Sequence, residues 1–434
     1  MKKIFLISSI VTILMSCGSS GNGELIGVQK REFWNPTDPY GMVFIPQGSF
    51  VMGPSDQDVP FANVSASKRV SVGAFYMDET EITNNEYRQF TNYVRDSLAH
   101  ILLGEAGIEG HLIEEDEFGN FLDPARINWK TKIRWNDQEV REILEEEMYL
   151  TSNERYNSLR EFDTRKYNYQ YEVLDLQDAS NKSKREGNAS GKRDRSEFLS
   201  VVTVNVYPDT LAWMHDYAYS FNEPYTNDYY SHTAYDDYPV VGVSWKQAVA
   251  FTKWRTQEMN KFLRANKQQA SPDFRLPTES EWEYAARGGQ DLSPYPWGGP
   301  YTRNNKGCFL ANFKPLRGNY VADGGLKTVK VASYNPNGYG LYDMSGNVAE
   351  WTSNAFDESA FSYAHDMNSD YHYNASEDDH PVLKRKVIRG GSWKDIAYFI
   401  QNSTRTYEYQ DTAKCYIGFR CAVDFLGRDK KDFQ

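Results

Sequence analysis

The chain has 434 residues, with 48 basic against 60 acidic side chains, a formal net charge of −12, and 40% hydrophobic residues. This hydrophobic content is sufficient for a buried core and excludes a wholly disordered chain. The acidic balance argues against general binding to nucleic-acid phosphates. At about 100–200 residues per domain, the length allows two or three domains, or one large domain with insertions.

The first seventeen residues have the pattern of a secretory signal. Two lysines precede an apolar run at residues 4–15 that is too short to span a bilayer. Cys17 follows and resembles the lipidated first residue of a bacterial lipoprotein; the alternative is an ordinary signal peptide with an incidental cysteine. Gly18 favours sorting to the outer membrane, by resemblance to sorting rules. We expect residues 1–16 to be a lipoprotein signal peptide and 17–40 a lipidated tether, with the mature protein facing the periplasm.

Short strands are expected next, at residues 42–46 and 48–53. Tyr, Phe and Val at helical spacing then predict a helix over residues 84–95. Thr83 or Asn84 is a suitable cap for this helix.

Residues 97–199 differ in composition from the segments on either side. They contain fewer glycine and tryptophan residues and many charged ones. We expect a charged, partly helical insertion here, with a helix at 139–150 that carries an apolar stripe. The basic run at 179–196 is interpreted as a solvated loop or as a docking patch for an acidic partner. The insertion would divide one domain into a first part at 41–96 and a second part at 200–426, followed by a polar tail at 427–434.

In the second part, a β-branched run predicts a strand at 198–206. A helix is expected at 245–259, with Ser244 as its cap. The rest of the chain, at 274–424, is turn-rich. No fixed-period repeat is present, which disfavours a solenoid or a propeller.

The motif at residues 275–289 combines an extended start with a helix capped by Thr278. Glu281 and Glu283 are candidate catalytic carboxylates when taken alone. A structural role, as cap and as buried ion-pair partner, is the interpretation we favour. Arg389 and Arg420 are similarly interpreted as buried ion-pair partners, in two closing core strands.

A tight turn at residues 338–351 concentrates oxygen donors. Asp343 and Glu350 offer carboxylates, and Gly346 and Val348 offer backbone carbonyls. Calcium binds this mixture of oxygens, while a turn held by Asn and Asp side chains is an equally suitable explanation. A weaker set of the same kind lies at residues 311–313 and 322–325.

Together these segments resemble the formylglycine-generating-enzyme (sulfatase-modifying factor) domain. The shared pieces lie at residues 41–53, 76–90, 238–254, 275–289, 296–298, 340–351, 389–393 and 418–422. The resemblance implies a large α+β fold with little regular secondary structure, related to C-type lectins and stiffened by calcium. It places one calcium site at Asp343, Gly346, Val348 and Glu350, and a second at Asn312, Phe313, Asp323 and Gly325.

This chain lacks the metal-binding residues on which the known reactions of this family depend. The oxidases use two copper-binding cysteines shortly after the Gly-Gly-Ser-aromatic motif, and residues 394–401 contain none. Ala349 also replaces the family's tryptophan. A sibling branch of iron-dependent sulfoxide synthases uses a His-x3-His-x-Glu set, which no histidine of this chain matches. We therefore expect no catalytic residues and no copper.

The remaining cysteines, Cys308, Cys415 and Cys421, allow at most one internal disulfide. They do not match the positions of the copper-binding pair. An oxidase with relocated cysteines is kept as the least favoured alternative.

A narrower resemblance is to the GldK/PorK lipoproteins of the type IX secretion and gliding motility machinery. It rests on residues 76–90, 222–224, 308–318 and 416–420, and on the charged segment before residues 207–210. It implies a non-catalytic, outer-membrane-anchored scaffold that forms a periplasmic ring with a GldN/PorN-type partner and other secretion components. A GldJ-like motility lipoprotein and a calcium-dependent glycan- or peptide-binding lipoprotein are the alternatives.

Overall fold

The computed structural model describes residues 37–427, except 55–58, 61–65, 117, 182–194, 218, 220, 323–324 and 366–368. Residues Asp38–Phe425 form one compact unit, to which all of the following applies. The predicted lipidation site at Cys17, the signal peptide, nearly all of the tether and almost all of the polar tail lie outside the described residues.

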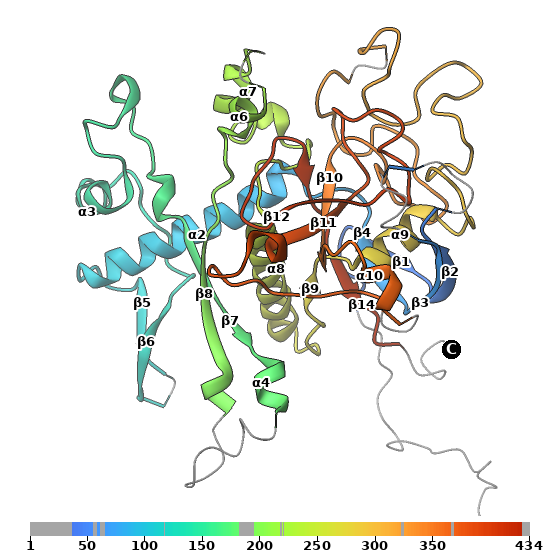
Figure 1. Ribbon diagram of the computed structural model, residues 1–434. Coiled ribbons are helices and arrows are strands. Elements are labelled where there is room, and N and C mark those ends of the chain that lie inside the picture. Colours follow the sequence, from blue (N-terminus) through green and yellow to red (C-terminus); the bar gives the residue numbers. More distant parts are fainter. Residues whose placement is uncertain are drawn as a thin grey trace, which may run out of the picture. The chain divides into compact units, whose positions relative to one another are not determined.

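Helices and strands alternate irregularly along this unit (Figure 1). The described α-helices are α2 (Asn84–Glu105), α3 (Gln138–Met148), α4 (Leu176–Ser180), α6 (Ala212–Asp216), α7 (Glu223–Asp228), α8 (Trp245–Ala265), α9 (Glu279–Arg287) and α10 (Ala360–Tyr363). The strands of the first half are β1 (Met42–Ile45), β2 (Gly48–Met52), β3 (Lys68–Val72), β4 (Phe75–Asp78), β5 (Leu112–Glu115), β6 (Phe121–Ile127), β7 (Asn168–Leu174) and β8 (Leu199–Asn205). Those of the second half are β9 (Phe274–Arg275), β10 (Ala349–Ala355), β11 (Arg385–Arg389), β12 (Thr406–Tyr409), β13 (Ile417–Gly418) and β14 (Ala422–Asp424).

The three helices whose caps were predicted, α2, α8 and α9, begin where expected. The side chains of Thr83, Ser244 and Thr278 each accept a hydrogen bond from the backbone N–H three residues later. The Glu or Gln side chain at that position accepts in turn from the backbone N–H of the cap residue. These reciprocal bonds satisfy backbone donors that the first helical turn leaves unpaired. α9 ends at Gly288, whose φ of 57° a side-chain-bearing residue would adopt only with strain.

Two four-stranded sheets organise the unit. The first has the order β1-β4-β14-β9 with antiparallel pairs, so the last strand of the chain lies between strands from its start and its middle. The second has the order β12-β11-β10-β13, with β13 parallel to β10. Both sheets therefore join segments that are far apart in the sequence.

The main core packs aromatic rings of α2 against α8. Tyr87 stacks on Phe251 with ring centroids 5.5 Å apart, and Phe90 meets Phe251 edge to face at 5.8 Å. Phe419, beside β13, completes this group at 5.4 Å from Phe251. Such offset and edge contacts are favourable beyond the area that they bury.

The expected insertion at 97–199 is not separable from this core. α2 runs through residue 97 to Glu105, and β8 begins at residue 199. β7 pairs with β8 along its whole length, and Tyr167 and Tyr169 are buried in the main core. Removing 97–199 would therefore open that core.

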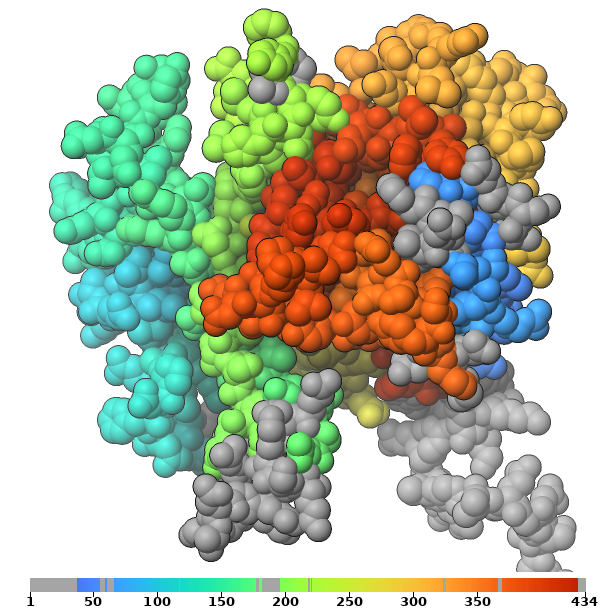
Figure 2. All heavy atoms as spheres, viewed as in Figure 1, coloured from blue at the N-terminus to red at the C-terminus, as the bar shows by residue number. Residues whose placement is uncertain are grey.

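A smaller core lies within this segment, where Ala99 and Leu103 of α2 pack with Val140, Leu144 and Met148 of α3. This contact explains why α2 continues ten residues past the predicted end at residue 95. In Figure 2 the earlier part of the segment, coloured teal, lies at one side of the view, and the end of the chain, coloured red, spreads over the centre of that face. Within the described part of the chain, no helix is both long and apolar enough to cross a membrane.

Candidate functional site

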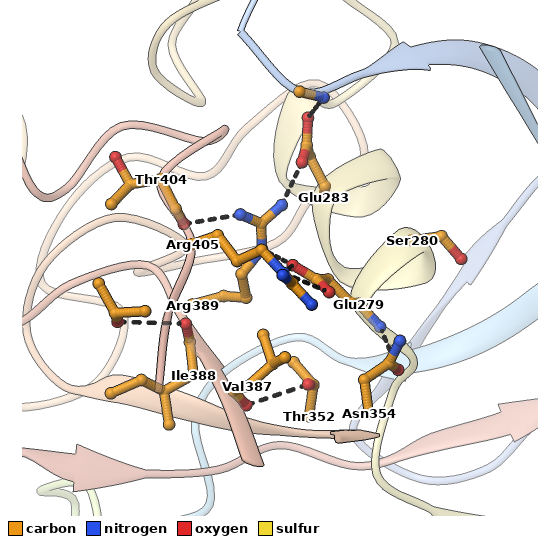
Figure 3. Close-up of polar contacts among 12 residues, drawn as sticks. Glu279, Ser280, Glu283, Thr352, Asn354, Val387, Ile388, Arg389, Thr404 and Arg405 are labelled. Atoms are coloured by element: carbon orange, nitrogen blue, oxygen red, sulfur yellow. Dashed lines mark hydrogen bonds and ion pairs between the residues drawn. The ribbon is translucent and has the colours of Figure 1, made fainter. Parts of the chain in front are cut away.

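The first buried cluster of charge is centred on α9. We call it the α9 cluster and define it as Glu279, Glu283, Arg287, Arg389 and Arg405. All five side chains are at most 2% exposed. They come from α9, from the end of β11 and from the turn before β12, so the cluster ties the second sheet to this helix. Figure 3 labels four of the five, all but Arg287.

Glu283 is the centre of the α9 cluster. Its Oε1 accepts hydrogen bonds from the Gly53 N–H at 2.9 Å and from Arg287 Nη2 at 2.7 Å, and its Oε2 pairs with Arg389. Burial alone would raise the pKa of Glu283, but Arg389 and Arg287 offset this and hold the pKa below its ordinary value. The carboxylate is fully engaged, which confirms the structural role favoured for Glu283 and for Arg389.

The other acids of this helix are engaged too. Glu279 accepts from Arg405 Nε at 2.8 Å, and the Glu279 N–H donates to Asn354. Glu281 accepts from both terminal nitrogens of Arg275 at 2.7 Å while it completes the cap at Thr278. Neither Glu281 nor Glu283 is available as a catalytic acid or base.

The second buried cluster contains Glu81, Asp343, Glu350 and Arg420, and we call it the Glu81 cluster. Arg420 donates to both oxygens of Glu350, at 2.8 and 2.6 Å. Trp282 Nε1 donates to the same carboxylate at 2.7 Å. This confirms Arg420 as a buried ion-pair partner, and it leaves Glu350 committed to Arg420 and Trp282.

Glu81 was not identified as a candidate from the sequence. It is fully buried, its Oε1 accepts from Asn347 Nδ2 at 3.1 Å, and its Oε2 has no hydrogen-bond partner among the described residues. Burial raises the pKa of Glu81 well above its ordinary value, and the Asp343 carboxylate raises it further. The only signal in the sequence was an acid just before a helix cap, because its partners lie more than 260 residues away.

Asp343 lies in the turn before β10 with a φ of 55°. Its Oδ2 accepts from the Ala332 N–H at 2.7 Å. Burial raises the pKa of Asp343 to about 6, and the Glu350 carboxylate acts in the same direction. The Glu81 cluster therefore has three carboxylates for one guanidinium.

The second predicted ligand set is brought together only in part. Asn312 donates from Nδ2 to the Lys327 carbonyl at 2.7 Å, and a Cβ placed on Gly325 would lie 2.6 Å from Asn312 Oδ1. Phe313 is buried in a small apolar group, while Asp323 lies outside the described residues. The Asn347 N–H donates to the Asn312 carbonyl at 2.8 Å, so this set adjoins the turn that carries Gly346 and Val348.

A hard cation fits the Glu81 cluster by one test of the donor set: a buried carboxylate oxygen there lacks a partner. Among the residues that the structure describes, no three His, Cys, Asp or Glu side chains are positioned to hold a metal ion by themselves. A cation at this place would need backbone carbonyl oxygens in addition to Glu81 and Asp343, as calcium commonly does.

The segment after Gly390-Gly391-Ser392-Trp393 forms a closed turn. Asp395 accepts from the Ser392 N–H at 3.0 Å and from Ser392 Oγ at 2.6 Å, and Ile400 is completely buried. Of the described thiols, Cys308 is exposed, whereas Cys415 and Cys421 are buried, and all three are free. Burial raises the pKa of both buried thiols, which disfavours the thiolate that binds copper.

The chain belongs to the sulfatase-modifying factor enzyme 1-like domain family, whose model matches residues 30–425. It is 27% identical over 403 residues to the formylglycine-generating enzyme of Bos taurus, covering 90% of this chain and 76% of that protein. It is 34% identical over 192 residues to the inactive C-alpha-formylglycine-generating enzyme 2 of Bos taurus, covering 43% of this chain and half of that protein. Among solved structures, PvdO from Pseudomonas aeruginosa is similar with a TM-score of 0.46 and 16% identity, covering 88% of this chain and 94% of that one.

Proposed function

We propose that this protein is a non-catalytic scaffold lipoprotein of the GldK/PorK type, anchored to the outer membrane through Cys17 and assembled in the periplasm with a GldN/PorN-type partner. The observation that carries the non-catalytic part is the turn at residues 392–401. At the place where the family's oxidases have thiolates, this chain has Asp395 bound to Ser392 and Ile400 in the core. A relative named as an inactive enzyme supports the idea that the fold is used without the chemistry.

The segment at 97–199 supplies the proposed partner surface. Residues 97–199 carry 22 acidic and 15 basic side chains, a net charge of −7, and six of the basic ones fall between residues 182 and 195. Glu142 and Glu146 of α3 are exposed, and neither forms a salt bridge within the described residues. A surface of this charge favours a basic partner and speeds its association.

Ring assembly would strengthen membrane attachment. A single lipid chain gives only marginal and reversible binding. A three-chain bacterial lipid on Cys17 would bind more firmly, and linking several such anchors would strengthen the attachment further. Self-association places many anchors on one particle, and each further anchor then binds in an effectively intramolecular step.

Gentle detergent extraction of the outer membrane, with capture through a C-terminal tag, tests this proposal. The expected product is a particle far larger than the 50.1 kDa monomer that contains one or two stoichiometric periplasmic partners. A lone monomer would overturn the scaffold assignment. A partner other than the GldN/PorN type would point to the GldJ-like alternative.

The partner surface has a matched control. Glu142→Lys with Glu146→Lys reverses two charges on α3 and is expected to reduce partner recovery severalfold at low salt. Glu377→Lys with Asp378→Lys reverses two exposed acids elsewhere and should leave recovery unchanged. Equal recovery from both double variants would contradict a partner surface on α3.

We further propose that the Glu81 cluster binds structural calcium, with Asp343, Gly346 and Val348 as further ligands and Glu350 held nearby by Arg420. The unpartnered oxygen of Glu81 supports this. The set at Asn312, Phe313, Asp323 and Gly325 is proposed as a second site. Ligands that bind only the folded state stabilise it by mass action, so a chelator is expected to lower the melting temperature.

The oxidase alternative is favoured by one observation: relatives that match about nine-tenths of this chain are named formylglycine-generating enzymes. Copper titration tests it directly. Tight Cu(I) binding that is lost in Cys415→Ser and Cys421→Ser would revive it, whereas the raised pKa of both thiols leads us to expect no such binding.

A further inference from the structure

A cavity of about 310 Å³ lies between the turn after β11 and residues 313–314, 320 and 325–326. Aromatic rings form much of its wall, and no acidic residue is among its described lining residues. The residues that matter here are Tyr217, Phe313, Tyr320, Trp393, Lys314 and Lys394. A space of this size, with apolar walls and few polar groups, is typical of small-molecule sites.

Lys394 contributes a positive charge to the lining of this cavity. Its Nζ lies 3.3 Å from the centroid of the Tyr416 ring, and among the described residues it forms no ion pair or hydrogen bond. Burial lowers the pKa of Lys394, although Asp395 and Asp216 act against this. An ammonium group held in this way gains from an anion that enters the cavity.

The two nearby carboxylates are already engaged. Asp216 accepts from the Cys415 N–H at 3.1 Å and from Lys414 at 3.2 Å. Asp395 accepts from Ser392 through both the backbone and the side chain. Neither carboxylate forms an ion pair with Lys394, so the ammonium group can still pair with an anionic ligand.

Trp393 adds an unsatisfied donor. Its side chain is 9% exposed and stacks on Trp213 with ring centroids 6.1 Å apart. Its Nε1 is buried and has no hydrogen-bond partner among the described residues. A buried N–H without an acceptor destabilises the folded state, and an acceptor oxygen on a ligand would remove this cost.

We propose that this cavity binds a small carboxylate with a flat apolar body, with the carboxylate at Lys394 and Trp393 Nε1 and the body against Tyr217 and Phe313. The polar groups are donors, so the ligand must present acceptors. A phosphate would need more donors than two lysines and one indole, and the described lining contains no arginine. The inference is independent of the scaffold role proposed above.

The test is calorimetric titration of the purified full-length protein with indole-3-acetate and with its neutral analogue indole-3-acetamide. The acid is expected to bind at least about ten-fold more tightly than the amide. Equal affinities, or no binding of the acid, would overturn the proposal.

Substitutions locate the site. Lys394→Met should weaken binding of indole-3-acetate about ten-fold, and Lys394→Arg should retain it. Trp393→Phe, which removes only the N–H and one ring, should weaken it severalfold. Lys261→Met is the matched control, because Lys261 also lies over an aromatic ring, 5.2 Å from Trp129, but outside the cavity. Loss of affinity in the control as large as in Lys394→Met would contradict the assignment.

The carboxylate has two sources, a free acid or the C-terminus of a peptide. The peptide Gly-Gly-Trp is compared with its C-terminal amide and with indole-3-acetate. Tighter binding of the free peptide supports a chain terminus, and tighter binding of indole-3-acetate supports a small acid. Equal binding of the peptide and its amide would overturn recognition of the carboxylate.

Discussion

The two buried clusters both place charged side chains in the protein interior, but they differ in their ratio of cations to carboxylates. The α9 cluster has three arginines for two glutamates, and the Glu81 cluster has one arginine for three carboxylates. The pKa of Glu283 is accordingly held below its ordinary value, whereas the pKa of Glu81 is raised. A cluster with surplus cations can use backbone carbonyls as further acceptors, as Arg389 does at Thr404. Backbone carbonyls cannot pair with surplus carboxylates in this way, because both are hydrogen-bond acceptors. Such a cluster therefore needs a proton or a metal ion.

The largest effect is expected from removing the only cation of the Glu81 cluster. Arg420→Met leaves three buried carboxylates with neutral hydrogen-bond donors but no cation, and removes the bonds from Arg420 to the carbonyls of Tyr342 and Asp78. Breaking a buried pair typically costs 3–5 kcal/mol, and we expect about 5 kcal/mol here, measured by urea unfolding at pH 7. The loss should be smaller at pH 5, because protonation of the carboxylates relieves their repulsion. A loss under about 1 kcal/mol would show that Arg420 does not balance this cluster.

The corresponding change in the α9 cluster is expected to cost less. Glu283→Gln keeps the shape of the side chain but leaves Arg287 and Arg389 with only Glu279 and backbone carbonyls, and about 3 kcal/mol should be lost in the same assay. Glu281→Gln is the control, since the pair of Glu281 with Arg275 is partly exposed and should contribute about 1 kcal/mol or less. Equal losses for Glu283→Gln and Glu281→Gln would contradict the special role of the buried pair.

Lys386 extends the comparison to a buried cation without any carboxylate. It is completely buried, donates to the Tyr373 carbonyl at 2.6 Å, and lies over the Trp245 ring, and burial lowers its pKa to about 8. The unfolded chain keeps this proton to about pH 10.4. Stability should therefore rise between about pH 8 and pH 10 as the folded state releases the proton first. Lys386→Met should remove this rise and gain about 1–2 kcal/mol at pH 7; an unchanged profile would show that Lys386 is not the group responsible.

The sequence was most informative where structure depends on near neighbours. The caps at Thr83, Ser244 and Thr278, and the nature of Glu283 and Arg389 as an ion pair, follow from short-range patterns and from the cost of burying charge. The identity of the partners could not be predicted, because Glu283 and Arg389 are 106 residues apart. Glu81 was missed for the same reason.

The segment at 97–199 shows where prediction from the sequence failed. Its composition indicated an insertion, yet Tyr167 and Tyr169 complete the main core. A change in charge along a chain reports on the surface, and it contains no information about a few buried rings within the segment. Boundaries drawn from composition alone therefore cut through α2 and β8.

The smallest change in stability is expected from Glu81→Gln, which tests the unpartnered oxygen of the Glu81 cluster. Glu81→Gln removes one surplus negative charge, so in the presence of a chelator the variant should be about 1 kcal/mol more stable than the parent chain. Thermal unfolding in EDTA measures this. A destabilised variant would show that the Glu81 carboxylate is satisfied without a cation.

The most direct measurement is the melting temperature of the full-length protein with calcium and with EDTA, taken in parallel on the parent chain, Glu81→Gln and Glu283→Gln. If the Glu81 cluster takes a cation, calcium raises the melting temperature of the parent chain and of Glu283→Gln by several degrees, and the gain in Glu81→Gln is much smaller. The same calcium response in all three proteins, or none in the parent chain, would contradict the account.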